Sequence, residues 1–113
     1  MHELWICQNI FEIVNQQAVK QSCVRVKRVY LEIGQLTMIE KSALTLCFNV
    51  VSKGTVAENA VLEIIEIPGS ARCDSCQQTV SVSQYYDYCR YCQNFSLTIM
   101  QGQELRIKSM EVE

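Results

Sequence analysis

Two Cys-x-x-Cys pairs constrain this chain more than any other feature of its sequence. Cys73 and Cys76 form the first pair, Cys89 and Cys92 form the second, and twelve residues separate the pairs. Each pair can fold into a tight turn that points both sulfurs the same way, and two such turns can close four thiolates around one tetrahedral zinc ion. Because four thiolates leave no open coordination position, such a site is structural rather than catalytic. We therefore predict a structural zinc ion held by these four cysteines.

The same cysteines are compatible with other states. Two disulfides or four unliganded thiols would hold no metal, and a rubredoxin-like iron site uses the same ligands. The chain has seven cysteines in all, which in a cytosolic protein favours metal or thiol chemistry over a disulfide framework. Many zinc-binding turns have glycine after the second cysteine, where a positive φ is easy. Gln77 and Gln93 occupy these positions here, so some strain in the turns is expected.

The segment around these cysteines has the composition of a separate insert. Residues 70–100 hold four of the seven cysteines and four of the five tyrosines. Pro68–Gly69 precedes the segment, and short alternating strands are expected at 80–82 and 97–99. About 30 residues bury too little apolar surface to fold alone, so the metal should stabilise them. We predict a zinc-ribbon domain at 69–102, inserted into a domain formed by residues 1–68 plus 103–113.

Hydrophobic periodicity predicts the elements of the surrounding domain. We expect helices at 3–21 and from about Thr37 to Lys53, and strands at 28–33, 61–67 and 104–112. Thr37 and Glu40 have the spacing of a capping box, and Gly54 stands where a glycine cap ends a helix. The strand at 61–67 is apolar enough to be buried on much of both faces. The expected fold class is α/β: a small sandwich of two helices on a three-stranded mixed sheet, with the four-cysteine zinc ribbon inserted.

The hydrophobic pattern also predicts which residues of these helices and strands face the core. The second helix has an expected buried stripe, formed by Ile39, Ala43, Leu46, Cys47 and Val50. In the strands, the apolar phase changes near Lys27 and again after Ser109, so a bulge is expected at both places. Cys7 and Cys47 lie on apolar helical stripes, where they are expected to pack in the core rather than to bind metal.

Charge argues against nucleic acid as the main partner. Lys and Arg number 10 against 12 Asp and Glu, which gives a net charge of −2. Within 70–100, Arg72 and Arg90 are balanced by Asp74 and Asp87. A ribbon without basic excess is a poor phosphate binder. A zinc-ribbon module that binds nucleic acid or protein nevertheless stays open as the alternative to the function described below.

Other classes of protein find little support in the sequence. No apolar run approaches the roughly 18 residues of a membrane span, and the first residues lack the basic start of a signal peptide, so we expect a cytoplasmic protein without membrane contact. The chain has one histidine and four glycines. These form no nucleophile–histidine pair with an orienting acid and no phosphate-binding glycine loop, so we do not expect an enzyme.

The single histidine, His2, stands where it could chelate a metal. A free Met1 amine, the His2 backbone nitrogen and the His2 imidazole can bind one ion through adjacent chelate rings, and Glu3 can add a further donor. Nitrogen-rich square-planar or tetragonal sites suit Ni(II) and Cu(II). A histidine in the second position is most often uninvolved, so this chemistry alone does not decide the matter.

A resemblance to a known family bears on whether His2 binds a metal. The chain resembles the HypA/HybF family of hydrogenase/urease nickel-incorporation proteins along essentially its whole length. The resemblance lies in Met1–Leu4, Val29–Gly34, Ser52–Thr55, the paired Cys-x-x-Cys motifs and Gln101–Ser109. It implies a nickel metallochaperone in which Met1, His2 and Glu3 bind the transported Ni(II) and the four cysteines bind structural Zn(II).

The resemblance also implies partners. These are a hydrogenase-maturation GTPase and the large subunit of a [NiFe]-hydrogenase, to which nickel is delivered. Whether urease is also served, and whether the chain forms a homodimer, stays open from the sequence.

Overall fold

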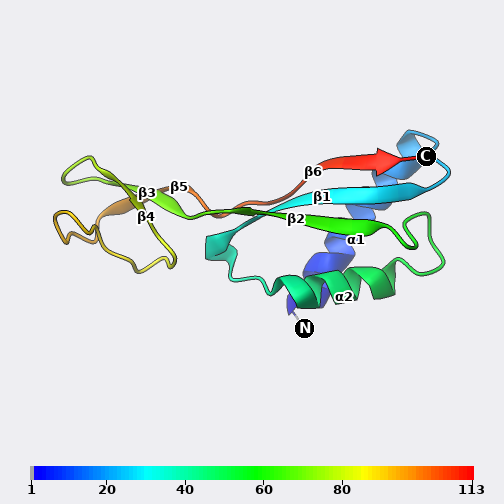
Figure 1. Ribbon diagram of the computed structural model, residues 1–113, viewed down its shortest axis with the longest axis horizontal. Coiled ribbons are helices and arrows are strands. Elements are labelled where there is room, and N and C mark those ends of the chain that lie inside the picture. Colours follow the sequence, from blue (N-terminus) through cyan, green and yellow to red (C-terminus); the bar gives the residue numbers. More distant parts are fainter. Residues whose placement is uncertain (1) are drawn as a thin grey trace. The chain divides into compact units, whose positions relative to one another are not determined.

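The computed structural model describes residues 2–113, apart from the side chain of His2. These residues form two compact units. The first contains the residues up to Leu31 together with Ile39–Ile65 and Arg106–Glu113, and the second contains Glu32–Met38 and Glu66–Leu105. Each unit has its own three-stranded sheet (Figure 1).

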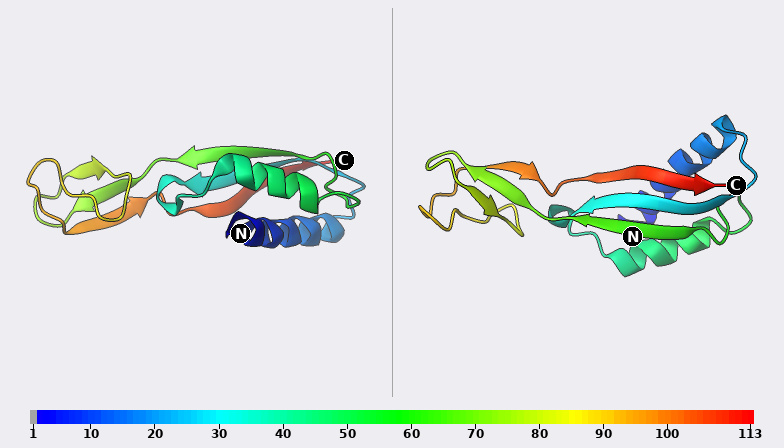
Figure 2. Two further views of the ribbon diagram at one scale, coloured as in Figure 1. Left: turned by 90° about the horizontal axis from the view of Figure 1, so that it is seen from below. Right: turned by 45° about the horizontal axis from the view of Figure 1, so that its top comes forward.

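The larger sheet is mixed, as predicted. Its strands are β1 (Val26–Gly34), β2 (Val61–Ile67) and β6 (Leu105–Val112), in the order β2-β1-β6. The helices that accompany it are α1 (His2–Lys20) and α2 (Lys41–Val51). The Val24 amide donates to the Glu113 carbonyl, and the Gly34 amide donates to the Glu104 carbonyl. These bonds at opposite ends of β1 make β6 antiparallel to it, whereas β2 runs in the same direction as β1 (Figure 2). Both helices cover one face of this sheet.

The core of the first unit lies between α1, α2 and β1. On α1, the buried side chains recur at helical spacing: Ile6, Cys7, Ile10, Val14 and Ala18. On β1, they are Val26, Val29 and Leu31. Burial switches phase between Val26 and Val29, where the sequence predicted an irregularity near Lys27. Helix α1 and strand β1 therefore form as predicted, because the apolar residues of each recur at the helical or the strand period.

The second helix begins later than predicted. Thr37 is not its N-cap but the end of a 3₁₀ helix, η1 (Gln35–Thr37), and the Thr37 hydroxyl donates to the Gly34 carbonyl at 2.8 Å. Met38 then adopts a left-handed conformation with φ of 59°. Glu40 caps α2 instead, because its carboxylate accepts hydrogen bonds from the amide and the hydroxyl of Ser42.

Two burial predictions for the first unit are wrong. On α2, the buried side chains are Leu44 and Phe48, whereas Leu46 is 66% exposed and Val50 is 57% exposed. Strand β2 is not buried on both faces either: Leu62 is its one buried residue. The reason is topological, since β2 is an edge strand and the helices cover only one face of the sheet.

The smaller sheet forms the ribbon of the second unit. Its strands are β3 (Ser70–Cys73), β4 (Thr79–Ser81) and β5 (Leu97–Gln101), in antiparallel order β4-β3-β5. The predicted strands at 80–82 and 97–99 correspond to β4 and β5, but the central strand β3 was not predicted. The apolar core under this sheet is formed by Leu36, Ala71, Val80 and Val82 together with Cys73 and Cys89.

Candidate metal centre

The four predicted cysteines come together in the second unit. Their Sγ atoms all lie within 4.8 Å of one another. The Sγ atoms of Cys73 and Cys92 are 3.5 Å apart, and those of Cys76 and Cys89 are 3.6 Å apart. A ZnS₄ tetrahedron with Zn–S bonds of about 2.3 Å has sulfur–sulfur edges of roughly 3.8 Å. The cluster therefore has the dimensions of a tetrahedral four-thiolate site, and its cysteines form no disulfides.

The two turns that present the sulfurs share one backbone pattern. The amide of Gln77 donates to the Cys73 carbonyl at 2.9 Å, and the amide of Gln93 donates to the Cys89 carbonyl at 2.7 Å. Both glutamines have positive φ, 66° and 63°. These are the positions where the sequence lacks the usual glycine, so the expected local strain is present in both turns.

Asp74 ties the first turn to strand β5. Its amide donates to the Ser96 carbonyl at 2.8 Å, and its carboxylate accepts from the Thr98 hydroxyl at 2.7 Å. In the sequence, Asp74 stands out only as a charged residue that balances a nearby arginine. No local motif marks this role, because Thr98 lies on a strand 24 residues further along the chain.

The thiols of the cluster differ in their acidity. Burial acts to raise the pKa of Cys89, but hydrogen bonds from the backbone N–H groups of Cys92 and Tyr91 and from the Cys76 and Cys92 thiols together outweigh it and lower that pKa to about 7. At Cys76, the N–H of Gln78 acts to lower the pKa, but burial and hydrogen bonding to the neighbouring thiols raise it to about 12. One thiolate is thus favoured while a neighbour keeps its proton. A bound cation would favour loss of the remaining protons.

The other predicted metal site lies largely outside the described residues. Helix α1 begins at His2, but Met1 and the His2 side chain are not described. Glu3 is half-buried in the first turn of α1. The structure therefore does not place the three predicted nickel ligands relative to one another.

The remaining three cysteines lie apart from the cluster. Cys7 is fully buried on α1, and burial together with the nearby Cys47 raises its pKa to about 11. The Cys23 thiol contacts the Ala18 carbonyl at 3.3 Å. Among the side chains that the structure describes, the four ribbon cysteines are the only group of three or more His, Cys, Asp or Glu residues close enough to share a metal ion.

Sequence comparison identifies relatives over the full length of the chain. A family model described as "Hydrogenase/urease nickel incorporation, metallochaperone, hypA" matches residues 1–112. "Hydrogenase maturation factor HypA" of Legionella pneumophila (strain Lens) is 55% identical over 113 residues, which is the whole of both chains. The protein of the same name from Azotobacter chroococcum is 45% identical, also over both whole chains.

Solved structures agree on the fold. The solution structure of the Ni metallochaperone HypA from Helicobacter pylori matches with a TM-score of 0.68 and 23% identity, covering 97% of this chain and 96% of that one. A second structure, described as the solution structure of HypA protein, matches with a TM-score of 0.73 and 24% identity, covering 100% and 97%. None of the described helices could cross a membrane. On the evidence of the family model and the full-length relatives, this chain belongs to the HypA family of hydrogenase/urease nickel-incorporation metallochaperones.

Proposed function

We propose that this chain is a nickel metallochaperone that delivers Ni(II) during the maturation of [NiFe]-hydrogenase. The observation that carries this proposal is the match of the nickel-incorporation family model to residues 1–112. The full-length relatives named as hydrogenase maturation factors support it. The alternative, a zinc-ribbon interaction module, has no such support, and the opposing charges of the ribbon do not favour binding to nucleic acid.

The four ribbon cysteines, Cys73, Cys76, Cys89 and Cys92, are proposed as the ligands of a structural zinc ion. Their mutual sulfur distances support this role. A four-thiolate site is closed to further ligands and therefore unsuited to passing its metal on. In this proposal residues 69–102 form the zinc domain, and residues 1–68 plus 103–113 form the nickel domain.

The transported nickel is proposed to bind at Met1, His2 and Glu3. A carrier needs an accessible site from which the metal can leave. Helix α1 begins at His2, so the His2 backbone N–H has no partner within the helix, and its nitrogen is available as a metal donor once it has lost its proton. Amine and imidazole nitrogens suit Ni(II). Since both must lose a proton to bind, nickel affinity should fall as the pH falls.

The same proposal includes the protein partners of this chain and its cellular location. A hydrogenase-maturation GTPase would time the transfer, and the hydrogenase large subunit would receive the nickel. Urease is a second candidate acceptor, because the family description includes urease. We further propose a cytoplasmic, non-enzymatic protein, in keeping with its proposed role as a carrier.

A nickel titration tests the proposal. Zinc-loaded protein with an untagged Met1 amine is titrated with Ni(II) by calorimetry, next to His2→Ala and a control, Gln8→Ala, at an exposed position further along α1. We expect the wild type and Gln8→Ala to bind one nickel with zinc retained, and His2→Ala to lose that binding. Equal binding by all three would show that nickel sits elsewhere. No binding by any of them would favour the interaction module.

A further inference from the structure

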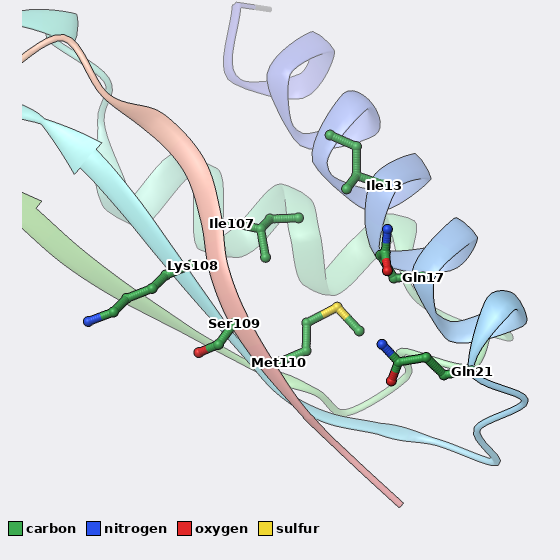
Figure 3. Close-up of a pocket in the computed structure, with 7 residues that line it drawn as sticks. All are labelled: Ile13, Gln17, Gln21, Ile107, Lys108, Ser109 and Met110. Atoms are coloured by element: carbon green, nitrogen blue, oxygen red, sulfur yellow. The ribbon is translucent and has the colours of Figure 1, made fainter.

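The groove between α1 and β6 in the first unit has a lining of mixed chemistry. Its volume is about 290 Å³, and glutamine and lysine side chains share its lining with apolar ones. Ile107 and Met110 face α1, whereas Lys108 and Ser109 between them point away from it (Figure 3). This change of phase is the irregularity that the sequence predicted after Ser109. The mixed lining does not favour one class of ligand.

A smaller hollow in the second unit has a more uniform lining. Its volume is about 120 Å³, and we call it the ribbon hollow. It is lined by Leu36, Met38, Gln84, Tyr85 and Tyr86. None of these lining residues is charged, and all but Gln84 present mainly apolar groups. The ribbon hollow therefore suits an uncharged and largely apolar ligand.

A tight turn holds the two tyrosines of the ribbon hollow. The Asp87 carboxylate accepts hydrogen bonds from the Ser83 amide at 2.8 Å and from the Gln84 amide at 3.3 Å. The Asp87 amide donates in turn to the Gln84 carbonyl at 3.2 Å. Tyr85 and Tyr86 lie inside this turn, and their side chains are 59% and 75% exposed. The turn thus presents two exposed aromatic rings on a backbone that is already ordered, which lowers the entropy lost on binding.

Met38 adds an exposed apolar side chain to the lining. It is 74% exposed and follows η1, where its amide donates to the Gln35 carbonyl at 3.3 Å. Its φ of 59° is left-handed, a conformation that costs a residue with a Cβ about 1–2 kcal/mol. Core packing does not explain this strain, because the side chain lies at the surface. Such strained positions are concentrated at binding sites.

The Tyr85 hydroxyl supplies a hydrogen-bond donor to this apolar lining. The Gln103 side-chain amide donates to the Tyr85 hydroxyl oxygen at 3.2 Å. A tyrosine hydroxyl that accepts one hydrogen bond still has its own proton to donate. No residue of the described part of the chain accepts that proton, so it is available to a carbonyl oxygen of a ligand.

The common modes of peptide recognition need different surfaces. An amphipathic helix needs a long groove for anchors on several turns, but about 120 Å³ has room for a single aliphatic side chain or ring. An added strand needs an open sheet edge, but the lining residues lie outside β3, β4 and β5. A polyproline II segment needs aromatic side chains and hydrogen-bond donors, because its backbone carbonyls have no partner within the segment. The ribbon hollow meets only this last requirement.

We propose that the ribbon hollow binds a proline-rich segment of a partner protein in the polyproline II conformation. One proline ring packs against Tyr85, Tyr86 and Met38, above the buried Leu36. A backbone carbonyl of the segment accepts a hydrogen bond from the Tyr85 hydroxyl. One ring and one hydrogen bond give weak binding, with a dissociation constant in the millimolar range.

Amide NMR spectra of the zinc-loaded, isotope-labelled chain test the proposal. The probe is a capped oligoproline peptide, and its control is a capped glycine–serine peptide of the same length. We expect oligoproline to shift the amide signals of residues 36–38 and 84–86 in a saturable way, and the control peptide to leave them unchanged. Signals that do not shift at millimolar oligoproline, or that shift equally with both peptides, would overturn the proposal.

Three variants test the contacts within the ribbon hollow. Tyr85→Phe keeps the ring and removes the hydroxyl, so oligoproline should bind about fivefold more weakly. Tyr86→Ala removes an exposed ring, so the fold is kept and binding should weaken about tenfold. The matched control, Tyr91→Phe, removes the hydroxyl of an exposed tyrosine outside the hollow and should bind like the wild type. The proposal is wrong if Tyr85→Phe binds as tightly as Tyr91→Phe, or if Tyr86→Ala binds as tightly as the wild type.

Discussion

Truncation of Cys92 should separate the metal-binding role of the ribbon cysteines from their packing role. Cys73 and Cys89 are fully buried in the core of the second unit, so their replacement would also leave a cavity. The Cys92 side chain is exposed although its sulfur belongs to the cluster. Cys92→Ala therefore removes one of the four proposed zinc ligands and almost no packing.

The expected loss of zinc affinity follows from the free energy that a zinc ion contributes to the fold, which we compare with the free energy contributed by the apolar core. Leu36, Val80 and Val82 are buried in this core, and their burial contributes about 5–9 kcal/mol at roughly 1.5–3 kcal/mol each. A structural zinc ion contributes about 10–16 kcal/mol, more than these three side chains together. If each thiolate supplies about a quarter of it, Cys92→Ala loses about 3–4 kcal/mol, and zinc binds roughly 100-fold to 1,000-fold more weakly.

Two measurements check this expectation. Competition with a chromophoric chelator gives the zinc affinity of the wild type, Cys92→Ala and a control, Cys23→Ala, whose thiol lies outside the cluster. Amide NMR spectra recorded during zinc removal should lose dispersion at residues 70–101 and keep it in α1 and β1. The reasoning is refuted if Cys92→Ala binds zinc as tightly as the control, or if the zinc-free ribbon keeps its dispersed amides.

Two further predictions concern stability and thiol reactivity. A Cβ on Gly34 would lie 2.0 Å from the Gly102 carbonyl oxygen, so Gly34→Ala should lower the free energy of unfolding by about 2–3 kcal/mol in urea. Gly54→Ala, where φ is +76° but space is open, should cost about 1 kcal/mol, and the reverse order would contradict the expected clash. The raised pKa of Cys7, about 11, keeps its thiol protonated at pH 8. Iodoacetamide should therefore label it only on unfolding, as peptide mass spectrometry would show, and labelling as fast as that of an unfolded control would contradict its burial.

Local pattern was sufficient to predict the cysteine cluster, because its four sulfurs come from two short segments of the chain. The spacing of the two Cys-x-x-Cys pairs predicted the cluster, because two short turns joined by a hairpin can bring four sulfurs together almost regardless of the rest of the fold. Glutamine stands in place of the usual glycine after each pair, which predicted strain at Gln77 and Gln93. Their positive φ is confirmed. The predicted roles of Met1, His2 and Glu3 rest on chemistry and resemblance, and they stay a prediction.

Local pattern was insufficient where several faces of an element are apolar. Helix α2 carries large apolar side chains nearly all round, so its periodicity did not show that Leu44 and Phe48 would be buried rather than Leu46 and Val50. Strand β3 is short and polar enough to escape prediction, yet pairing with both β4 and β5 makes it the centre of the ribbon.

The sequence by itself determined the elements with a clear period, the four cysteines that come together in one cluster, and the mixed three-stranded sheet with its insert. Tertiary structure decided where α2 begins, which of its faces is buried, and that β2 and β6 are edges. The start of α2 shows the reason. Thr37 has capping spacing, but the Leu36 amide donates to the Gly102 carbonyl 66 residues away, and this holds the chain in a 3₁₀ turn. Such contacts join residues far apart in the chain, and no local pattern encodes them.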